Sequence, residues 1–321
     1  MTSWLVTGGA GYIGAHIVKA LRDRGEPVVV LDDLTTGRPD RTGDAPLVRG
    51  SVLDTDLVGA TLREHRVSGI IHVAAKKQVG ESVERPLHYY RENVGGLVSL
   101  LEAATSNGVG SFVFSSSSAT YGMPDVERVT EDTPLAPMSP YGETKVAGEW
   151  LAHATAAASD MRVISLRYFN VAGAASPALG DPGLFNLIPL ALRSLTNGEA
   201  PKVFGGDYPT PDGTCIRDYV HVADVADAHL SALDFLNNGG GSATYNVGRG
   251  EGSSVREVLS MIADVTGLTT GPEVLPRRPG DPSRIVASAD RIREDLGWAA
   301  RYDLRAIVES AWEAWGAPSP T

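Results

Sequence analysis

Cysteine is almost absent from this chain of 321 residues, since Cys215 stands alone. A single cysteine excludes an internal disulfide and any cysteine-rich metal site, so we expect a reducing, cytoplasmic location and no metal ion. Long apolar runs are also lacking, and without a stretch of about 18 apolar residues we expect no transmembrane helix and no membrane as a partner. Residues 1–7 contain neither a basic region nor a long apolar stretch, which predicts that there is no signal peptide.

Basic residues are outnumbered, because 28 Lys and Arg face 39 Asp and Glu and give a net charge of −11. Long-range attraction to nucleic acid or to an anionic membrane is therefore not expected. An anionic small molecule stays compatible with this balance, because local arginines and helix N-termini can outweigh the global field. The contents of hydrophobic residues, 42%, and of charged residues, 21%, are ordinary for a soluble globular protein.

Short apolar runs alternate with helix-length segments through the first half of the sequence. The runs expected to be buried strands are 5–7, 28–31, 70–73, 112–114 and 163–166, and the helix-length stretches are 12–24, 86–105 and 141–158. Near-continuous apolar strands with helical crossovers are typical of a doubly wound parallel α/β sheet.

The composition changes after about residue 170, where Gly, Pro, Asp and Asn become dense, as in 174–186 and 205–213. A chain of this length is long for a single core. We therefore expect a first domain over 1–170 and a smaller, loop-rich α/β domain made mainly of 171–321. Segment 217–236 is regular enough to return to the first domain, and residues 316–321 are expected to form a loose tail.

A glycine-rich turn follows the first expected strand directly and opens the first expected helix. It reads Gly8-Gly9-Ala10-Gly11-Tyr12-Ile13-Gly14, a Gly-x-x-Gly-x-x-Gly spacing. Such glycines let the backbone approach a pyrophosphate, and the helix N-terminus adds N–H groups and partial positive charge. Strand, turn, helix, second strand and acid in this order predict a Rossmann-type dinucleotide site, although a tight strand-to-helix turn alone would use the same glycines.

An acidic residue, Asp32, ends the second expected strand, 18 residues past Gly14. A carboxylate there accepts hydrogen bonds from the ribose hydroxyls of NAD and repels the 2′-phosphate of NADP, so the sequence favours NAD. A solvated loop acid or a helix cap is the alternative interpretation of Asp32. Asp33 follows directly, which leaves a register error of one residue open.

Tyr141 and Lys145 are four residues apart in a segment that begins after Ser139-Pro140. Proline suits the first position of a helix, and residues at i and i+4 share a helix face, so the phenol and the ammonium can enter one cleft. A nearby cation, helped by a positive nicotinamide ring, lowers the pKa of a tyrosine towards neutrality, and the phenolate can then act as a general base. An ordinary exposed helix pair is the alternative.

Four serines, Ser115 to Ser118, follow the expected strand 112–114. Open α/β sheets bind ligands at the carboxyl ends of their strands, so a serine there can hydrogen-bond a reacting sugar hydroxyl. A merely polar strand end is the alternative. Together with Tyr141 and Lys145, the serines favour an active site.

Five stretches resemble the extended branch of the short-chain dehydrogenase/reductase superfamily, and within it the UDP-glucose 4-epimerases. They are Thr7 to Gly14, Val79-Gly80-Glu81-Ser82, Ser139-Pro140-Tyr141-Gly142-Glu143-Thr144-Lys145, Leu166-Arg167-Tyr168-Phe169-Asn170 and the block Gly206 to Val222. The last block is far more specific than the glycine turn. The resemblance extends from about residue 3 to residue 315.

The resemblance implies a role for each matching residue. Tyr141 is the base, Lys145 lowers its pKa and holds the nicotinamide ribose, and Ser117 assists at the sugar 4-hydroxyl, since it is the third serine after Phe114 and lies four residues before Tyr121. The implied contacts of a tightly bound NAD are Gly8, Gly11, Tyr12, Ile13, Gly14, Asp32, Asp33, Ser51, Val52, Val73, Ala74, Ala75, Lys77, Asn93, Ser115, Tyr141, Lys145 and Tyr168. The implied contacts of a UDP-sugar are Lys77, Ser117, Tyr141, Phe169, Asn170, Asn186, Leu187, Val203, Phe204, Arg217, Tyr219, Arg278, Asp281 and Ile285.

The resemblance also implies an activity: reversible C4 epimerisation of UDP-galactose and UDP-glucose through a transient 4-keto sugar, in galactose metabolism. It implies a homodimer that pairs through helices 86–105 and 141–158. An epimerase of another UDP-sugar (UDP-N-acetylhexosamine, UDP-uronate or UDP-pentose) is the alternative, and Ile285, smaller than the tyrosine sometimes found there, predicts some activity on UDP-N-acetylglucosamine.

Two further alternatives fit the sequence less well. A 4,6-dehydratase needs a carboxyl pair where Ser118 and Ala119 stand, and a non-catalytic NAD-binding protein has no need of Ser117, Tyr141 and Lys145. One departure from the family concerns Gly50-Ser51-Val52, which stands where an acid often touches the adenine. We therefore expect adenine contacts that are weaker or made by the backbone alone.

Overall fold

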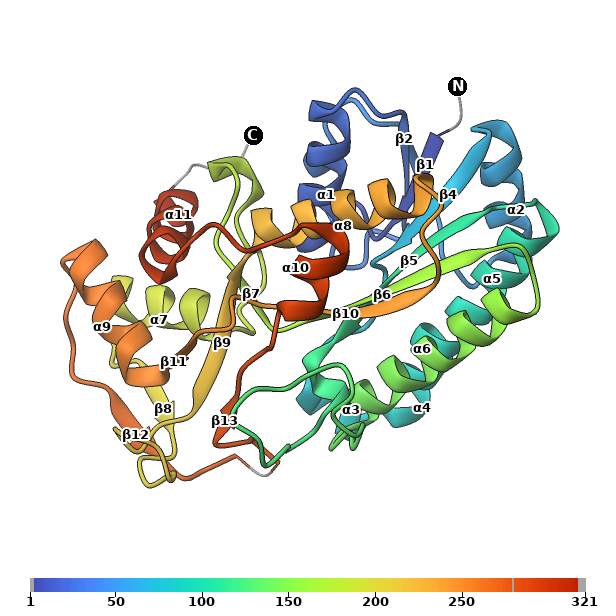
Figure 1. The fold of residues 1–321 in the computed structure, drawn as a ribbon. Helices are drawn as coiled ribbons and strands as arrows, with labels where there is room; N and C mark the ends of the chain where they lie inside the picture. The colour runs from blue at the N-terminus through green and yellow to red at the C-terminus, as the bar shows by residue number, and fades with distance from the viewer. Residues whose placement is uncertain (1–2, 279, 317–321) are drawn as a thin grey trace.

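A seven-stranded sheet forms the centre of the computed structural model, which describes residues 3–278 and 280–316 (Figure 1). The strands lie in the order β10-β6-β5-β4-β1-β2-β3, and all neighbouring pairs run parallel. Their bounds are β1 Ser3–Thr7, β2 Val28–Asp32, β3 Leu47–Arg49, β4 Val67–His72, β5 Ser111–Ser117, β6 Arg162–Tyr168 and β10 Ala243–Val247. The expected doubly wound parallel sheet is confirmed, with its switch point between β1 and β4.

Two layers of helices cover the sheet, because its strands are apolar on both faces. In β1, for example, Leu5 and Val6 point to opposite faces and belong to separate apolar cores. Helices α1 (Tyr12–Asp23) and α8 (Val222–Asn237) pack on one face, and α2 (Thr55–Glu64), α5 (Gly96–Ser106) and α6 (Pro140–Ala157) pack on the other (Figure 1). The ends of the strands are therefore where polar side chains can gather.

The stretch 86–106 is helical throughout, but its hydrogen bonding changes twice. Helix α4 (Pro86–Tyr89) passes into the π-helical segment η2 (Tyr90–Gly95) and then into α5. A π-helical turn shifts side chains around the helix axis and is frequent at functional sites. Here Asn93 is only 6% exposed, whereas Tyr90 on the same segment is 40% exposed. The sequence pattern predicted a uniform helix and gave no sign of this shift.

A smaller second region surrounds strand β9 (Ile216–His221). β9 pairs with β7 (Asn170–Ala172), β11 (Gly252–Ser254) and β13 (Arg284–Ile285), while β8 (Lys202–Phe204) pairs with β12 (Glu273–Leu275). A third apolar core lies between helices α7 (Leu187–Thr196), α9 (Val255–Thr266) and α11 (Leu304–Gly316). The expected loose tail lies outside the described residues, apart from Gly316.

Segment 217–236, which we expected to return to the first domain, divides at His221. Its strand, β9, belongs to the small sheet, whereas its helix, α8, packs beside α1 on the large sheet. The strand that joins the large sheet comes later: β10 pairs with β6, and α10 (Asp290–Leu296) packs beside it. The sequence did not reveal β10, which follows the glycine-rich residues 239–241 and lies far along the chain from the strands that it joins.

Four buried histidines make the fold sensitive to acid. Burial lowers the pKa of His16, His221 and His229 to about 4 and that of His72 to about 3. An unfolded histidine takes up its proton near pH 6.5, so this part of the stability is complete above that pH and is lost as the pH falls towards about 4.

The loss of stability at low pH can be measured. Each histidine contributes a slope of about 1.4 kcal/mol per pH unit below pH 6.5. Burial raises the pKa of Asp218 to about 6, so Asp218 gains stability as the pH falls and cancels the loss from about one histidine. We expect the free energy of unfolding in urea to fall by about 2 to 4 kcal/mol between pH 6 and pH 5. The variant His229→Gln should show a shallower slope, and a flat profile in the wild type would contradict this assignment.

Candidate active site

A deep cleft opens at the carboxyl ends of β1, β2, β4 and β5. Its volume is about 1400 Å³ when the space open to solvent is included, which is ample for a dinucleotide. Of the eighteen predicted cofactor residues, all except Asn93 line it: Gly8, Gly11, Tyr12, Ile13, Gly14, Asp32, Asp33, Ser51, Val52, Val73, Ala74, Ala75, Lys77, Ser115, Tyr141, Lys145 and Tyr168. Residues that are far apart in the sequence thus share one surface.

The glycine turn forms the floor of this cleft at the switch point of the sheet. Gly8 has φ +71°, and a Cβ atom built there would lie 2.7 Å from the Ala74 nitrogen. A Cβ atom on Gly14 would lie 2.1 Å from the Gly8 carbonyl oxygen. Helix α1 begins after Gly11 without a side-chain cap, so its N-terminus faces the cleft uncovered. The turn therefore has the close backbone approach and the free helix end that a pyrophosphate requires.

Asp32 and Asp33 both line the cleft where β2 ends. The Asp32 carboxylate accepts hydrogen bonds from the Ala10 nitrogen at 3.0 Å and the Leu34 nitrogen at 2.8 Å, and it is only 7% exposed. Burial raises the pKa of Asp32, and the two backbone hydrogen bonds act against that rise. A carboxylate fixed in this way, with free lone pairs towards the cleft, fits a pair of ribose hydroxyls.

Asn93 supports the cleft from behind and does not line it. Its side chain accepts a hydrogen bond from the Lys76 nitrogen at 2.8 Å and donates to the Lys76 carbonyl and to the Thr144 hydroxyl, each at 3.0 Å. Lys76, which the sequence analysis did not single out, extends its ammonium to 4.0 Å from the Asp33 carboxylate and lines the cleft. Asn93 therefore fixes the segment that carries Lys76 and Lys77.

Tyr141 and Lys145 lie one turn apart near the start of α6, where the Ser139 hydroxyl caps the helix by accepting from the Gly142 nitrogen at 3.2 Å. The Lys145 ammonium donates to the Ser115 carbonyl at 2.7 Å and lies 5.9 Å from the centre of the Tyr141 ring. Burial lowers the pKa of Lys145 to about 8, while the charge of Glu149 raises it. The Tyr141 phenol and the Lys145 ammonium therefore lie together at the carboxyl end of β5, in the cleft.

The pKa of Tyr141 differs from the expectation. Burial raises it, and the nearby Ser117 hydroxyl acts in the lowering direction. Lys145 does not counter the burial, because its ammonium is directed to the Ser115 carbonyl. The protein's own groups thus leave Tyr141 protonated near neutral pH, and the predicted lowering would need a further positive charge in the cleft.

The residues predicted to hold the UDP-sugar are grouped mainly around β9. Arg217 pairs with the Asp281 carboxylate, Ile285 lies opposite Arg217 in the β13–β9 register, and Tyr219 lies opposite Asn170 in the β7–β9 register. Phe169, between β6 and β7, donates from its backbone to the Val247 carbonyl. These side chains come from separate stretches of sequence and meet because β9 lies in the middle of the small sheet.

A second group lies along β8 and the start of α7. The Arg278 guanidinium stacks 3.7 Å from the centre of the Phe204 ring, next to Val203 in β8. Asn186 precedes α7, and its amide donates to the Asp181 carboxylate at 3.0 Å, while Leu187 is the first residue of the helix. An arginine over an aromatic ring gives a surface that can take both a phosphate and a flat base.

Several residues that line the dinucleotide cleft were not predicted from the sequence. Loop 181–185 reaches it from the second half of the chain, and Glu81 and Glu92 reach it from the helices after β4. The density of Gly, Pro and Asp predicted a loop at 174–186, but nothing in the sequence told which cleft the loop would face. The missed residues are Leu31, Thr36, Gly50, Lys76, Gln78, Glu81, Glu92, Ser116, Asp181, Pro182, Gly183 and Phe185.

Across 3–278 and 280–316, no group of three or more His, Cys, Asp or Glu side chains is arranged to hold a metal ion. In the same part of the chain, the helices are too short or too polar to cross a membrane.

Comparisons with known proteins identify the family. The model of the NAD dependent epimerase/dehydratase family matches residues 4–248. A protein of Azospirillum brasilense named UDP-glucose 4-epimerase is 47% identical over 318 residues, which cover 96% of this chain and 91% of that relative. The crystal structure of UDP-glucose 4-epimerase from Brucella ovis in complex with NAD is 40% identical with a TM-score of 0.94, covering 98% of this chain and 99% of that one.

The UDP-glucose 4-epimerase from Bifidobacterium longum, in complex with NAD+ and UDP, is 33% identical with a TM-score of 0.91, covering 98% of both chains. The resemblance predicted from the sequence is thereby confirmed. The chain belongs to the NAD-dependent epimerase/dehydratase family and, within it, to the UDP-glucose 4-epimerases.

Proposed function

We propose that this chain catalyses the reversible C4 epimerisation of UDP-galactose and UDP-glucose, with an NAD that stays bound throughout. The observation that carries the proposal is that Tyr141 and Lys145 line the same cleft as the glycine turn and Asp32. A base and a dinucleotide site in one cleft fit the removal of a hydride and a proton from a single alcohol. The family selects the UDP-sugar among the alcohols that such a site can oxidise.

Each residue of the site has one task in this proposal. NAD, when bound, supplies a reversible acceptor for the hydride. Tyr141 removes and returns the proton of the sugar 4-hydroxyl, and Ser117 hydrogen-bonds the same oxygen. Lys145 holds the nicotinamide ribose, while Asp32 holds the other ribose and the glycine turn holds the pyrophosphate.

The substrate must be held at one end and free at the other. The transient 4-keto sugar has to rotate before the hydride returns to its opposite face. The nucleotide therefore supplies most of the binding contacts, and the sugar has few. Arg217 and Arg278 suit the diphosphate, since guanidinium groups bind its oxygens with two parallel hydrogen bonds. Asp281 suits the uridine ribose, and Phe204 suits the uracil ring.

The proposal can be tested with purified protein and UDP-galactose, with no NAD added. Formation of UDP-glucose under these conditions would support both the epimerisation and the retained cofactor. Activity that appears only after NAD is supplied would support the reaction and reject the tight binding. No product even with added NAD would reject this substrate.

We also propose a homodimer in which two copies pair through one exposed apolar face. Val83 in α3 (Val79–Glu84) is 62% exposed, Leu87 in α4 is 81% exposed, and Trp150 in α6 is 67% exposed. The three helices pack against one another, so these side chains share a region of the surface (Figure 1). Apolar groups exposed together favour association.

Light scattering after gel filtration tests this dimer. We expect twice the mass of 33.8 kDa for the wild type and a single copy for Trp150→Glu. Val274→Glu is a suitable control, because Val274 is 50% exposed but lies in β12, in the other half of the molecule. A wild type that runs as one copy at micromolar concentration would reject the dimer.

The cellular setting follows from the same chemistry. The exchange of galactose and glucose on UDP belongs to galactose metabolism, and we assign the protein there. We place it in the cytoplasm, a reducing compartment that suits a chain whose single cysteine, Cys215, is buried and unpaired.

A further inference from the structure

A buried ion pair between Glu149 and Arg167 lies next to the active-site residues, one turn of α6 beyond Lys145. Glu149 follows Lys145 by four residues and Tyr141 by eight in α6, so all three share one face of the helix. The Arg167 guanidinium, from β6, donates to the two Glu149 carboxylate oxygens at 2.8 and 2.6 Å. Glu149 is 3% exposed and Arg167 is 5% exposed.

The same carboxylate accepts a hydrogen bond from the Ser116 hydroxyl. Ser116 stands between two residues of the site: the carbonyl of Ser115 accepts from the Lys145 ammonium, and the hydroxyl of Ser117, the last residue of β5, accepts from the Ala119 nitrogen at 3.2 Å. Glu149 thus ties the end of β5 to the helix that carries Tyr141 and Lys145. The spacing between β5 and α6 beside Tyr141 and Lys145 depends on this hydrogen bond.

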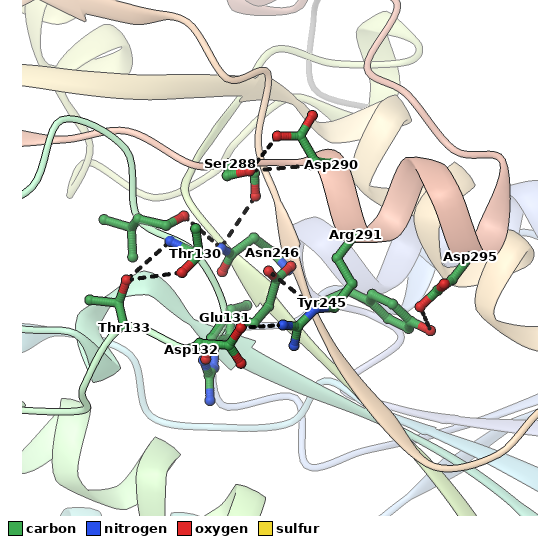
Figure 2. A network of polar contacts seen from close by, with 12 residues as sticks. Thr130, Glu131, Asp132, Thr133, Tyr245, Asn246, Ser288, Asp290, Arg291 and Asp295 are labelled. Carbon is green, nitrogen blue, oxygen red and sulfur yellow. Dashed lines mark hydrogen bonds and ion pairs between the residues drawn. The ribbon is translucent and has the colours of Figure 1, made fainter.

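Arg167 is in turn held on its other side. It donates to the Tyr121 hydroxyl at 2.7 Å and to the Glu131 carbonyl at 3.1 Å, and Tyr121 donates to the Asn246 amide oxygen at 2.7 Å. Figure 2 shows that Asn246 and Glu131 belong to a wider network with Arg291, and the Asn246 backbone donates to the Glu131 carboxylate at 2.8 Å. The guanidinium is therefore fixed from two directions.

A buried ion pair is no requirement for stability, because well-packed apolar side chains of similar volume stabilise a core as well or better. The ion pair orients the Glu149 carboxylate, since a bidentate contact fixes its angle as well as its distance. We propose that Glu149 is a positioning residue of the active site, which holds Ser116 and so sets Ser117 against Tyr141. This inference rests on the proposed epimerisation for its kinetic test.

Glu149 also acts on Lys145 through its charge. The groups that face Lys145 are Tyr141 and Glu149 on α6, His72 on β4, the Ser115 carbonyl and Phe114 on β5, and Tyr168 on β6. Burial keeps His72 neutral, because its pKa is lowered to about 3, and burial also raises the pKa of Tyr168. Among these groups, Glu149 is the carboxylate that favours the ammonium form of Lys145.

Three variants test the inference. Glu149→Gln keeps the shape and removes the charge; Ser116→Ala removes the tie and leaves the ion pair in place. Glu257→Gln is the matched control, because it removes one carboxylate charge from the first turn of α9 in the other half of the molecule, which lowers stability a little without touching the site. Each is assayed for kcat and KM with UDP-galactose across pH and for thermal unfolding.

We expect kcat to fall on the order of tenfold in both Glu149→Gln and Ser116→Ala, with KM changed less than about twofold. In Glu149→Gln alone, the alkaline loss of activity should begin about half a pH unit or more lower, because Lys145 loses its proton more readily. Glu257→Gln should change neither quantity. If Glu149→Gln and Ser116→Ala only unfold at lower temperature, as the control does, Glu149 is structural and the inference is wrong.

A second readout separates this inference from the reaction itself. The chain has five lysines, so the side-chain nitrogen of Lys145 can be followed by nuclear magnetic resonance of protein labelled at lysine. Its titration should move to lower pH in Glu149→Gln and stay in place in Glu257→Gln, whatever the substrate. Inactivity of the wild type on UDP-galactose would reject the proposed function, whereas an unmoved titration would reject the charge effect of Glu149.

Discussion

Replacing Tyr141 by phenylalanine is expected to lower the turnover of UDP-galactose by about three orders of magnitude, the range that a lost general acid–base group produces. The ring stays in place in Tyr141→Phe, so its packing against the cleft is kept and only the hydroxyl disappears. The 4-hydroxyl proton then loses its proposed acceptor, and neither Lys145, whose ammonium donates to the Ser115 carbonyl, nor Ser117, a poor base, replaces it. The measurement is kcat with UDP-galactose, followed as UDP-glucose.

Two accompanying measurements make this result specific. The NAD content of the purified variant should equal that of the wild type, since the phenol does not hold the glycine turn. Tyr302→Phe should keep full activity, because Tyr302 is 39% exposed and stacks on His221. A Tyr141→Phe enzyme that retains more than a tenth of the activity would show that another group takes the proton.

Gly14→Ala is expected to abolish cofactor binding and with it more than 99% of the activity (roughly a hundredfold or greater loss). The added Cβ atom would stand 2.1 Å from the Gly8 carbonyl oxygen, far inside van der Waals contact. Neither side can yield cheaply, because Gly8 already has φ +71° and is packed against the Ala74 backbone. The turn must open, and the pyrophosphate loses its backbone contacts.

The measurement is the NAD released from the denatured protein, together with turnover before and after NAD is added. Gly241→Ala is the control, because a Cβ atom at that position meets nothing within 4 Å. Secondary structure by circular dichroism should be close to the wild type, since the clash is confined to the start of α1. A Gly14→Ala protein that is purified with its full NAD content would contradict the close approach described for this turn.

The sequence predicted the central strands well for a physical reason. Strands buried on both faces are apolar at nearly every position, so 28–31 and 112–114 were visible without any knowledge of their partners. β3 and α2 were missed, since β3 has three residues of mixed burial and α2 has two well-buried apolar positions, Val58 and Leu62. β10 was missed because a strand added from far along the chain has no local signature of the sheet that it joins.

The site was predicted to the extent that its chemistry lies in short motifs. Gly8 to Gly14 form the connection from β1 into the first turn of α1, and Tyr141 with Lys145 span one turn of α6, so their spacing alone carries the geometry. Glu149 and Asn93 act through partners that are 18 and 17 residues away in sequence, and Asp181 reaches the cleft across a loop. Such contacts depend on the tertiary fold, and a single sequence does not encode them in any local pattern.

The path of the chain has a consequence for synthesis. The large sheet receives its last strand, β10, and a covering helix, α8, from residues 222–247, after the chain has already built β7 and β8 of the other half. While the polypeptide leaves the ribosome, the face of the sheet beneath α8 stays uncovered until those residues emerge. A nascent chain stalled near residue 170 would expose part of an apolar core to chaperones and proteases. The two halves therefore mature together and cannot be separated by one cut.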